Sequence, residues 1–134
     1  MKVDGACHCG NIAFEAEVDE GKVLVCHCAD CQTLSGSAFR TIAFGPDSAF
    51  RLLRGKMQVY VKTAESGNKR EQTFCPQCGS PVYSTSPGAG PKLLGFRVGV
   101  LSQRNLLKPH KQIWCQSAQD WTADIDGLPK VDKQ

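Results

Sequence analysis

Three closely spaced cysteines, Cys26, Cys28 and Cys31, form the stretch of this sequence that is best suited to chemistry. Thiolates bind zinc at a Zn–S distance of about 2.3 Å, so the ligands must lie on one short, concave piece of backbone. In an extended segment alternate side chains share a face, which places Cys26 and Cys28 together and points His27 away. A turn at residues 29–30 then returns Cys31 to the same side. A redox Cys-x-x-Cys pair would leave Cys26 without a role, so the spacing favours a metal.

Two further cysteine pairs have the spacing of zinc knuckles. Gly10 follows the first pair, and the second is Cys75-Pro76-Gln77-Cys78-Gly79, where proline sets the entry and glycine allows the backbone amides to face sulfur. A tetrahedral metal needs four ligands, and joining two motifs about 70 positions apart would stabilise a fold of short strands. The sequence therefore predicts a structural zinc site made of Cys7, Cys9, Cys75 and Cys78.

The eighth cysteine, Cys115, leaves the ligand set of the second site open. Without it, Cys26, Cys28 and Cys31 form a three-sulfur site whose fourth position can accept solvent or substrate, as in catalytic zinc sites. With it, the eight cysteines make two closed sets of four, as in a non-enzymatic module. A lone cysteine is usually a small buried hydrophobic residue, so we prefer the open site and keep the closed one as the alternative.

Composition narrows the class of protein. A chain of 134 residues is predicted to form a single zinc-binding domain over residues 1–134. No apolar run approaches the roughly 18 residues of a membrane helix, and no apolar stretch precedes the first cysteine, so we expect a cytoplasmic protein with reduced thiols. The net charge of +3 lacks the basic stripe with interleaved aromatic residues that is typical of nucleic-acid binding.

The elements that position the cysteines are predicted to be mainly β. Residues 11–18 alternate apolar and polar side chains as a half-buried strand does, and the apolar run 22–25 leads into the central cysteines. Residues 32–37 predict a turn or one helical turn, and residues 37–44 predict a strand buried on both faces.

The second half of the chain continues this pattern. A turn at residues 54–56 predicts a hairpin with the alternating strand 57–61. Residues 93–101 predict another strand, and the tail is expected to dock with Trp114 and Trp121 as core anchors. His8 and His27 are expected to pack or form hydrogen bonds away from the metal, and His110 to lie on the surface.

In order, these motifs resemble the glutathione-dependent formaldehyde-activating enzyme family, also called the centromere protein V domain family. The resemblance rests on Cys7-x-Cys9-Gly10, then Cys26-His27-Cys28-x-x-Cys31 with Ser35-Gly36, then Phe74-Cys75-x-x-Cys78-Gly79. It implies a compact fold of several coiled antiparallel sheets and two Zn²⁺ sites, one structural and one catalytic. It also implies a carbon–sulfur lyase reaction in which glutathione and formaldehyde form S-hydroxymethylglutathione.

The residues themselves favour thiol chemistry at the second site. Three thiolates give a zinc centre a formal charge of −1, which acidifies water less than a centre with three neutral histidines does. We therefore expect Cys26, Cys28 and Cys31 to serve a reaction of a small thiol, such as glutathione, with an electrophile. Backbone amides near Ser35 and Gly36, together with Arg40, are candidates to hold substrate carboxylates, although a surface arginine is ordinarily only solvated. The alternative function is a zinc module with two structural sites that binds a protein or nucleic acid.

Overall fold

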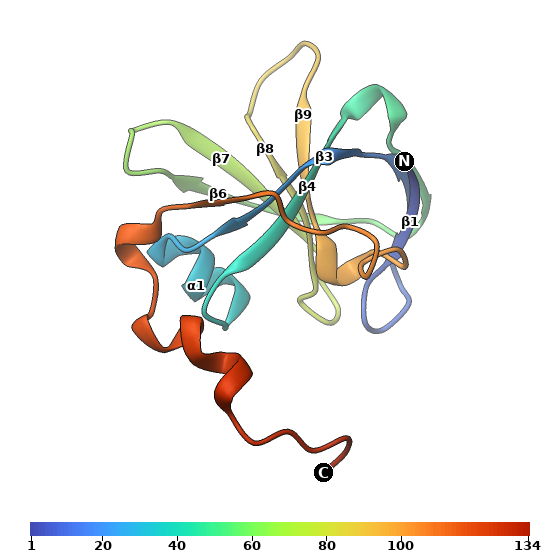
Figure 1. Cartoon of the computed structure of the whole chain (residues 1–134). Helices are drawn as coiled ribbons and strands as arrows, with labels where there is room; N and C mark the ends of the chain where they lie inside the picture. Colours follow the sequence, from blue (N-terminus) through green and yellow to red (C-terminus); the bar gives the residue numbers. More distant parts are fainter.

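Two β-sheets and one short α-helix make up the computed structural model, which describes residues 1–134 (Figure 1). A three-stranded sheet has the order β1-β2-β5, and a seven-stranded sheet has the order β10-β3-β4-β9-β8-β7-β6. All pairs are antiparallel except β10 with β3, which is parallel. The predicted mainly β class is therefore confirmed, with one parallel pair added. No helix has the length and apolarity needed to cross a bilayer.

The strands are short and follow one another closely. The element bounds are β1 Lys2–Ala6, β2 Ala13–Glu17, β3 Asp19–Cys26, α1 Ala29–Ser35, β4 Arg40–Pro46, β5 Arg51–Arg54, β6 Gln58–Thr63, β7 Lys69–Phe74, β8 Pro81–Thr85, β9 Leu93–Arg97 and β10 Lys111–Ile113. Short 3-10 helices cover Asp47–Ala49, Val98–Val100, Cys115–Ser117 and Asp120–Gly127.

The core lies where the two sheets meet, and the alternation of residues 11–18 supplies one side of it. Ile12, Phe14, Ala16 and Val18 are all buried, as the period of two predicts. The ring of Phe14 stacks on Phe96 of β9 at a centroid distance of 5.8 Å, which joins the small sheet to the large one. The main core contains fifteen buried residues, two of them cysteines: Val3, Cys7, Ile12, Phe14, Ala16, Val18, Val23, Ala43, Cys75, Val82, Leu94, Phe96, Val98, Leu101 and Leu107.

Gly45 of β4 allows the closest backbone approach between these layers. A Cβ added there would lie 1.9 Å from the carbonyl oxygen of Glu17. We expect Gly45→Ala to lower the free energy of unfolding by about 3 kcal/mol, because backbone must move to make room. Gly99→Ala is the matched control, since nothing lies within 4 Å of its added Cβ and its effect should stay within about 0.5 kcal/mol. Urea unfolding followed by circular dichroism measures both, and equal midpoints would contradict the prediction.

The predicted hairpin at residues 54–56 is wrong. β5 pairs with β2 in the small sheet, whereas β6 pairs with β7 and forms the edge of the large one. The chain therefore crosses between sheets at residues 55–57. As an edge strand, β6 leaves Val59, Tyr60 and Val61 each about half exposed, so its alternating pattern does not correspond to a buried face.

Two other predictions, on the length of the strand at residues 93–101 and on the tryptophans of the tail, are wrong. The strand predicted for residues 93–101 ends at Arg97 and continues as a 3-10 helix, Val98–Val100. The tail does not supply core anchors, because Trp114 is 40% exposed and Trp121 is 53% exposed. In Figure 1 the last part of the chain extends away from the sheets. The only strand after β9 is β10, which pairs with the last three residues of β3.

Candidate metal centres

The cysteines of the two knuckles meet at one place. The sulfur atoms of Cys7, Cys9, Cys75 and Cys78 all lie within 4.8 Å of one another. The Cys7–Cys9 and Cys9–Cys75 sulfur distances are 3.5 and 3.8 Å. A regular tetrahedron with Zn–S bonds of about 2.3 Å has edges of about 3.8 Å, so this four-sulfur set fits a zinc ion. All eight cysteines are free of disulfides.

Tight turns aim these sulfurs inward, as the knuckle motifs predict. In the first turn the amide of Gly10 donates to the Cys7 carbonyl at 3.0 Å, and the Ile12 amide donates to the Cys7 sulfur at 3.1 Å. In the second turn the Gly79 amide donates to the Cys75 carbonyl at 2.8 Å. Both glycines have φ near +77°, the left-handed region that favours glycine.

Hydrogen bonds favour the thiolate form of Cys78 and Cys7, whereas for Cys9 the Asn11 amide is outweighed by burial and the neighbouring thiols, which raise its pKa to about 12. The Ser80 hydroxyl, followed by the backbone amides of Cys9 and Ser80, lowers the pKa of Cys78 to about 5. Burial alone would raise the pKa of Cys7, but the Ile12 amide and the thiols of Cys9 and Cys75 lower it below the usual value. Thiolate is the form that ligates metals, so the donor set is suited to a cation.

The central cysteines form a second, smaller cluster. The sulfurs of Cys26, Cys28 and Cys31 lie within 4.8 Å of one another. Cys26 ends β3, Cys28 is the N-cap of α1, and the Cys31 amide donates to the Cys28 sulfur at 3.3 Å. The first turn of a seven-residue helix therefore returns Cys31 to the cluster, where the sequence predicted a simple turn with at most one helical turn after it. With three sulfurs, the cluster can hold a metal and leave one position free.

The pKa values in this cluster separate strongly. Cys31 shares a hydrogen bond with Cys26, and the guanidinium of Arg40 adds a hydrogen bond and its positive charge, so the pKa of Cys31 falls to about 5. The same hydrogen bond, together with burial, raises the pKa of Cys26. Of these two residues, Cys31 is therefore favoured as the thiolate and Cys26 as the thiol, and metal binding would release the remaining proton.

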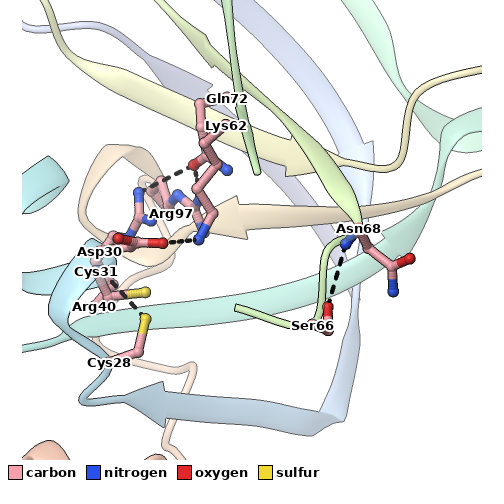
Figure 2. A network of polar contacts seen from close by, with 9 residues as sticks. All are labelled: Cys28, Asp30, Cys31, Arg40, Lys62, Ser66, Asn68, Gln72 and Arg97. Atoms are coloured by element: carbon pink, nitrogen blue, oxygen red, sulfur yellow. Dashed lines mark hydrogen bonds and ion pairs between the residues drawn. The ribbon is translucent and has the colours of Figure 1, made fainter. Parts of the chain in front are cut away.

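Arg40 is a buried residue, so the expectation of a solvated surface arginine is wrong. Arg40 is 6% exposed and lies opposite Cys26 in the pairing of β3 with β4. A second buried arginine, Arg97 of β9, is 5% exposed. The carbonyl oxygen of the Gln72 side chain accepts from Arg97 at 2.8 Å and from Arg40 at 3.4 Å (Figure 2).

Arg97 is the functional candidate that the sequence interpretation missed. Burial, followed by the charge of Arg40, lowers the pKa of Arg97 to about 9, while the nearby thiols partly offset this. The available signal was a single charged residue within the apolar run 93–101, which is unusual for a strand buried on both faces.

The other predicted binding residues lie at the end of α1. Ser35 lines the same cavity as Arg40, whereas Gly36 is exposed and ends the helix in the left-handed conformation. An ion pair between Lys62 of β6 and Asp30 joins α1 to the sheet edge (Figure 2). This ion pair holds the first turn of the helix, which carries Cys31.

Cys115 lies outside the second cluster. It is exposed and is not among the sulfurs that gather around Cys31. The closed four-sulfur set of the alternative interpretation is therefore not formed, and neither is the small buried cysteine expected from composition. The nearby tail contacts α1, because Gln32 donates to the carbonyl oxygen of Ser117 at 2.9 Å. Gln32 also donates to the carbonyl oxygen of His27 at 2.8 Å.

The three histidines do not join either cluster. His27 is buried, its Nε2 lies 2.8 Å from the side-chain oxygen of Gln112, and its ring packs edge-on against Phe39. His8 is exposed, and the exposed His110 contacts the Glu20 carbonyl at 3.0 Å. The predicted packing and surface positions are confirmed for His27 and His110.

Comparison with known proteins relates the chain to a protein family and to a solved structure. A family model described as "Glutathione-dependent formaldehyde-activating enzyme" matches residues 2–117. A crystal structure of a Rhodobacter sphaeroides protein superposes with a TM-score of 0.60 at 23% sequence identity, over 84% of this chain and 99% of that one. At this identity the second match supports the fold alone. Residues 118–134, which include Trp121, lie beyond the family match.

Proposed function

Because this chain belongs to the glutathione-dependent formaldehyde-activating enzyme family, we propose that it joins a small thiol, such as glutathione, to an aldehyde. In the reaction the thiol sulfur adds to the carbonyl carbon, one C–S bond forms, and the thiol proton is transferred to the carbonyl oxygen. With formaldehyde the product is S-hydroxymethylglutathione. The reverse direction breaks the same bond, which makes the enzyme a carbon–sulfur lyase.

One observation carries this proposal: the second cluster has three sulfurs and Cys115 is not the fourth. Three protein ligands leave room for a substrate, as in catalytic zinc sites. The absence of Cys115 from the cluster also removes the main support for a module with two closed structural sites.

In this proposal Cys26, Cys28 and Cys31 hold a catalytic zinc. When bound, zinc would supply a positive charge that lowers the pKa of a substrate thiol and orients its sulfur. The chain contributes the surrounding charge: Arg40 beside Cys31 stabilises negative sulfur. The Lys62–Asp30 ion pair and the Gln32 hydrogen bonds keep α1 in position. Ser35, Gly36 and Arg40 remain our candidates for substrate contacts.

We assign the other roles in the same way. Cys7, Cys9, Cys75 and Cys78 would hold a structural zinc, because Cys7 and Cys75 belong to the main core. We propose that residues 1–134 work as one zinc-binding domain, since that core contains residues of both sheets. Eight free cysteines favour a reducing compartment, the cytoplasm.

Cobalt substitution tests the proposed thiol binding. We expect glutathione to change the thiolate-to-cobalt charge-transfer absorption of the Co²⁺-loaded protein, because a fourth sulfur joins three. S-methylglutathione, which has no free thiol, is the matched control and should leave the spectrum unchanged. A glutathione titration without spectral change would show that the thiol does not ligate the metal, and the proposal would fail.

A further inference from the structure

A cavity of about 440 Å³ is lined by three arginines and no acidic side chain, and it is linked to the second cysteine cluster through Arg40, which pairs with Cys26, and Ser35, which shares α1 with Cys31. The arginines are Arg40 from β4, Arg97 from β9 and Arg104 from the loop that follows. The polar residues Ser35, Thr41 and Asn105 line the same space. Because β4 and β9 are neighbours in the large sheet, two of the arginines are held on rigid strands. The lining therefore has the charge of an anion-binding site.

The two buried arginines have little within the protein to balance them. The Nε atoms of both Arg40 and Arg97 are buried without a hydrogen-bond partner. Both arginines donate to the same neutral acceptor, the side-chain oxygen of Gln72 (Figure 2). A buried charge is costly unless it is paired and hydrogen-bonded, and two like charges side by side add repulsion. A bound anion would reduce both costs.

The nearby thiolates account for only part of this charge. Arg40 lies opposite Cys26 in the pairing of β3 with β4, so one of the two buried guanidinium groups has the cysteine cluster beside it. Arg104 is exposed and its one side-chain hydrogen bond goes to the Gly99 carbonyl, at 3.3 Å. The only acidic residue in this network, Asp30, is already paired with Lys62. Positive charge thus remains on Arg97 and Arg104.

We propose that Arg40, Arg97 and Arg104 form a binding site for a carboxylate group of the substrate, next to the thiol site. A carboxylate has two oxygens in one plane, which matches the donors of a guanidinium. This inference builds on the proposed function, because it makes an acid-bearing substrate, rather than a neutral thiol or formaldehyde alone, the preferred ligand. Arg97 and Arg104 become substrate-binding residues in addition to Arg40.

Acetate and its neutral isostere acetamide test the site without any thiol or aldehyde. In ¹⁵N-labelled, zinc-loaded protein, we expect acetate to shift the Nε–Hε signals of Arg40 and Arg97, and acetamide to leave them in place. Arg104→Gln, at an exposed position, should weaken acetate binding on the order of tenfold. Arg51→Gln on the small sheet is the control for losing a surface charge and should have no effect.

The outcomes separate this inference from the proposed function. If zinc loading shifts the Nε signals but acetate does not, the arginines only balance the thiolates and the carboxylate site is wrong, whatever the cobalt titration shows. If acetate binds, Arg104→Gln then shows whether the thiol or the aldehyde carries the carboxylate that the site binds. If Arg104→Gln weakens the binding of 3-mercaptopropionate more than that of 2-mercaptoethanol, the carboxylate belongs to the thiol. If Arg104→Gln changes the affinities for both thiols equally and glyoxylate shifts the Nε signals, the carboxylate belongs to the aldehyde.

Discussion

Cys31→Ser is expected to reduce the bound zinc from two equivalents to about one and to lower the carbon–sulfur bond-forming activity more than about 100-fold. Loss of outer-shell partners alone typically costs about 10–100-fold in metal affinity or activity, and a direct ligand matters more. Hydrogen bonds from Cys26 and then Arg40 also lower the pKa of Cys31 to about 5, which favours its thiolate form. Serine at this position would not ionise at neutral pH.

The fold should survive this change. Cys31 belongs to a small buried cluster with Cys26 and Ile42, separate from the main core. We expect the far-ultraviolet circular dichroism of Cys31→Ser to match that of the unaltered protein. Zinc content by metal analysis and turnover with glutathione and formaldehyde are the two measurements.

Cys115→Ser is the matched control, since it makes the same atomic change at an exposed cysteine outside the cluster. It should keep two equivalents of zinc and full activity. If Cys115→Ser instead lost one equivalent, the second site would be closed by four sulfurs, and the case for catalysis there would be withdrawn.

Cys75→Ser is expected to unfold the protein at 25 °C. Structural zinc sites contribute apparent binding free energies of about 10–16 kcal/mol, whereas an ordinary domain is stable by only about 5–15 kcal/mol. Cys75 is fully buried in the main core, and its site joins the N-terminal turn to the turn after β7. Loss of this ligand therefore removes a cross-link and leaves three thiolates incompletely neutralised.

Circular dichroism and metal analysis together test this expectation. Cys75→Ser should lose sheet signal and both zinc equivalents, because the second cluster depends on the same sheet for its geometry. Cys31→Ser provides the comparison, as the same substitution in the other cluster. A folded Cys75→Ser protein with one zinc and an unchanged urea midpoint would show that the first site does not stabilise the fold.

The sequence predicted the parts of this protein that depend on local spacing. Ile12, Phe14, Ala16 and Val18 are buried because strand geometry alone alternates side chains between faces. The cysteine clusters also follow from short-range rules, since a knuckle turn aims both of its sulfurs, and four ligands are required. Because a tetrahedral zinc needs four ligands and each knuckle supplies two, the sequence also predicted that Cys7 and Cys75 belong to one site.

Errors arose wherever strand pairing across the chain decided the result. The alternating residues of β6 predicted a hairpin partner in β5, but pairing with β7 placed β6 at a sheet edge, where apolar side chains remain exposed. Trp114 and Trp121 are large enough to anchor a core, yet the core is already filled by Phe14, Phe96 and their neighbours.

The sequence by itself determined the mainly β class, the family and the two sets of clustered cysteines, because each rests on residue type and local spacing. Only the tertiary structure decided what surrounds the second cluster. The sheet order brings Arg40, Arg97 and Gln72 together from three strands, and the path of the tail keeps Cys115 outside. Burial and charge at a site depend on contacts between distant segments, which no local pattern encodes.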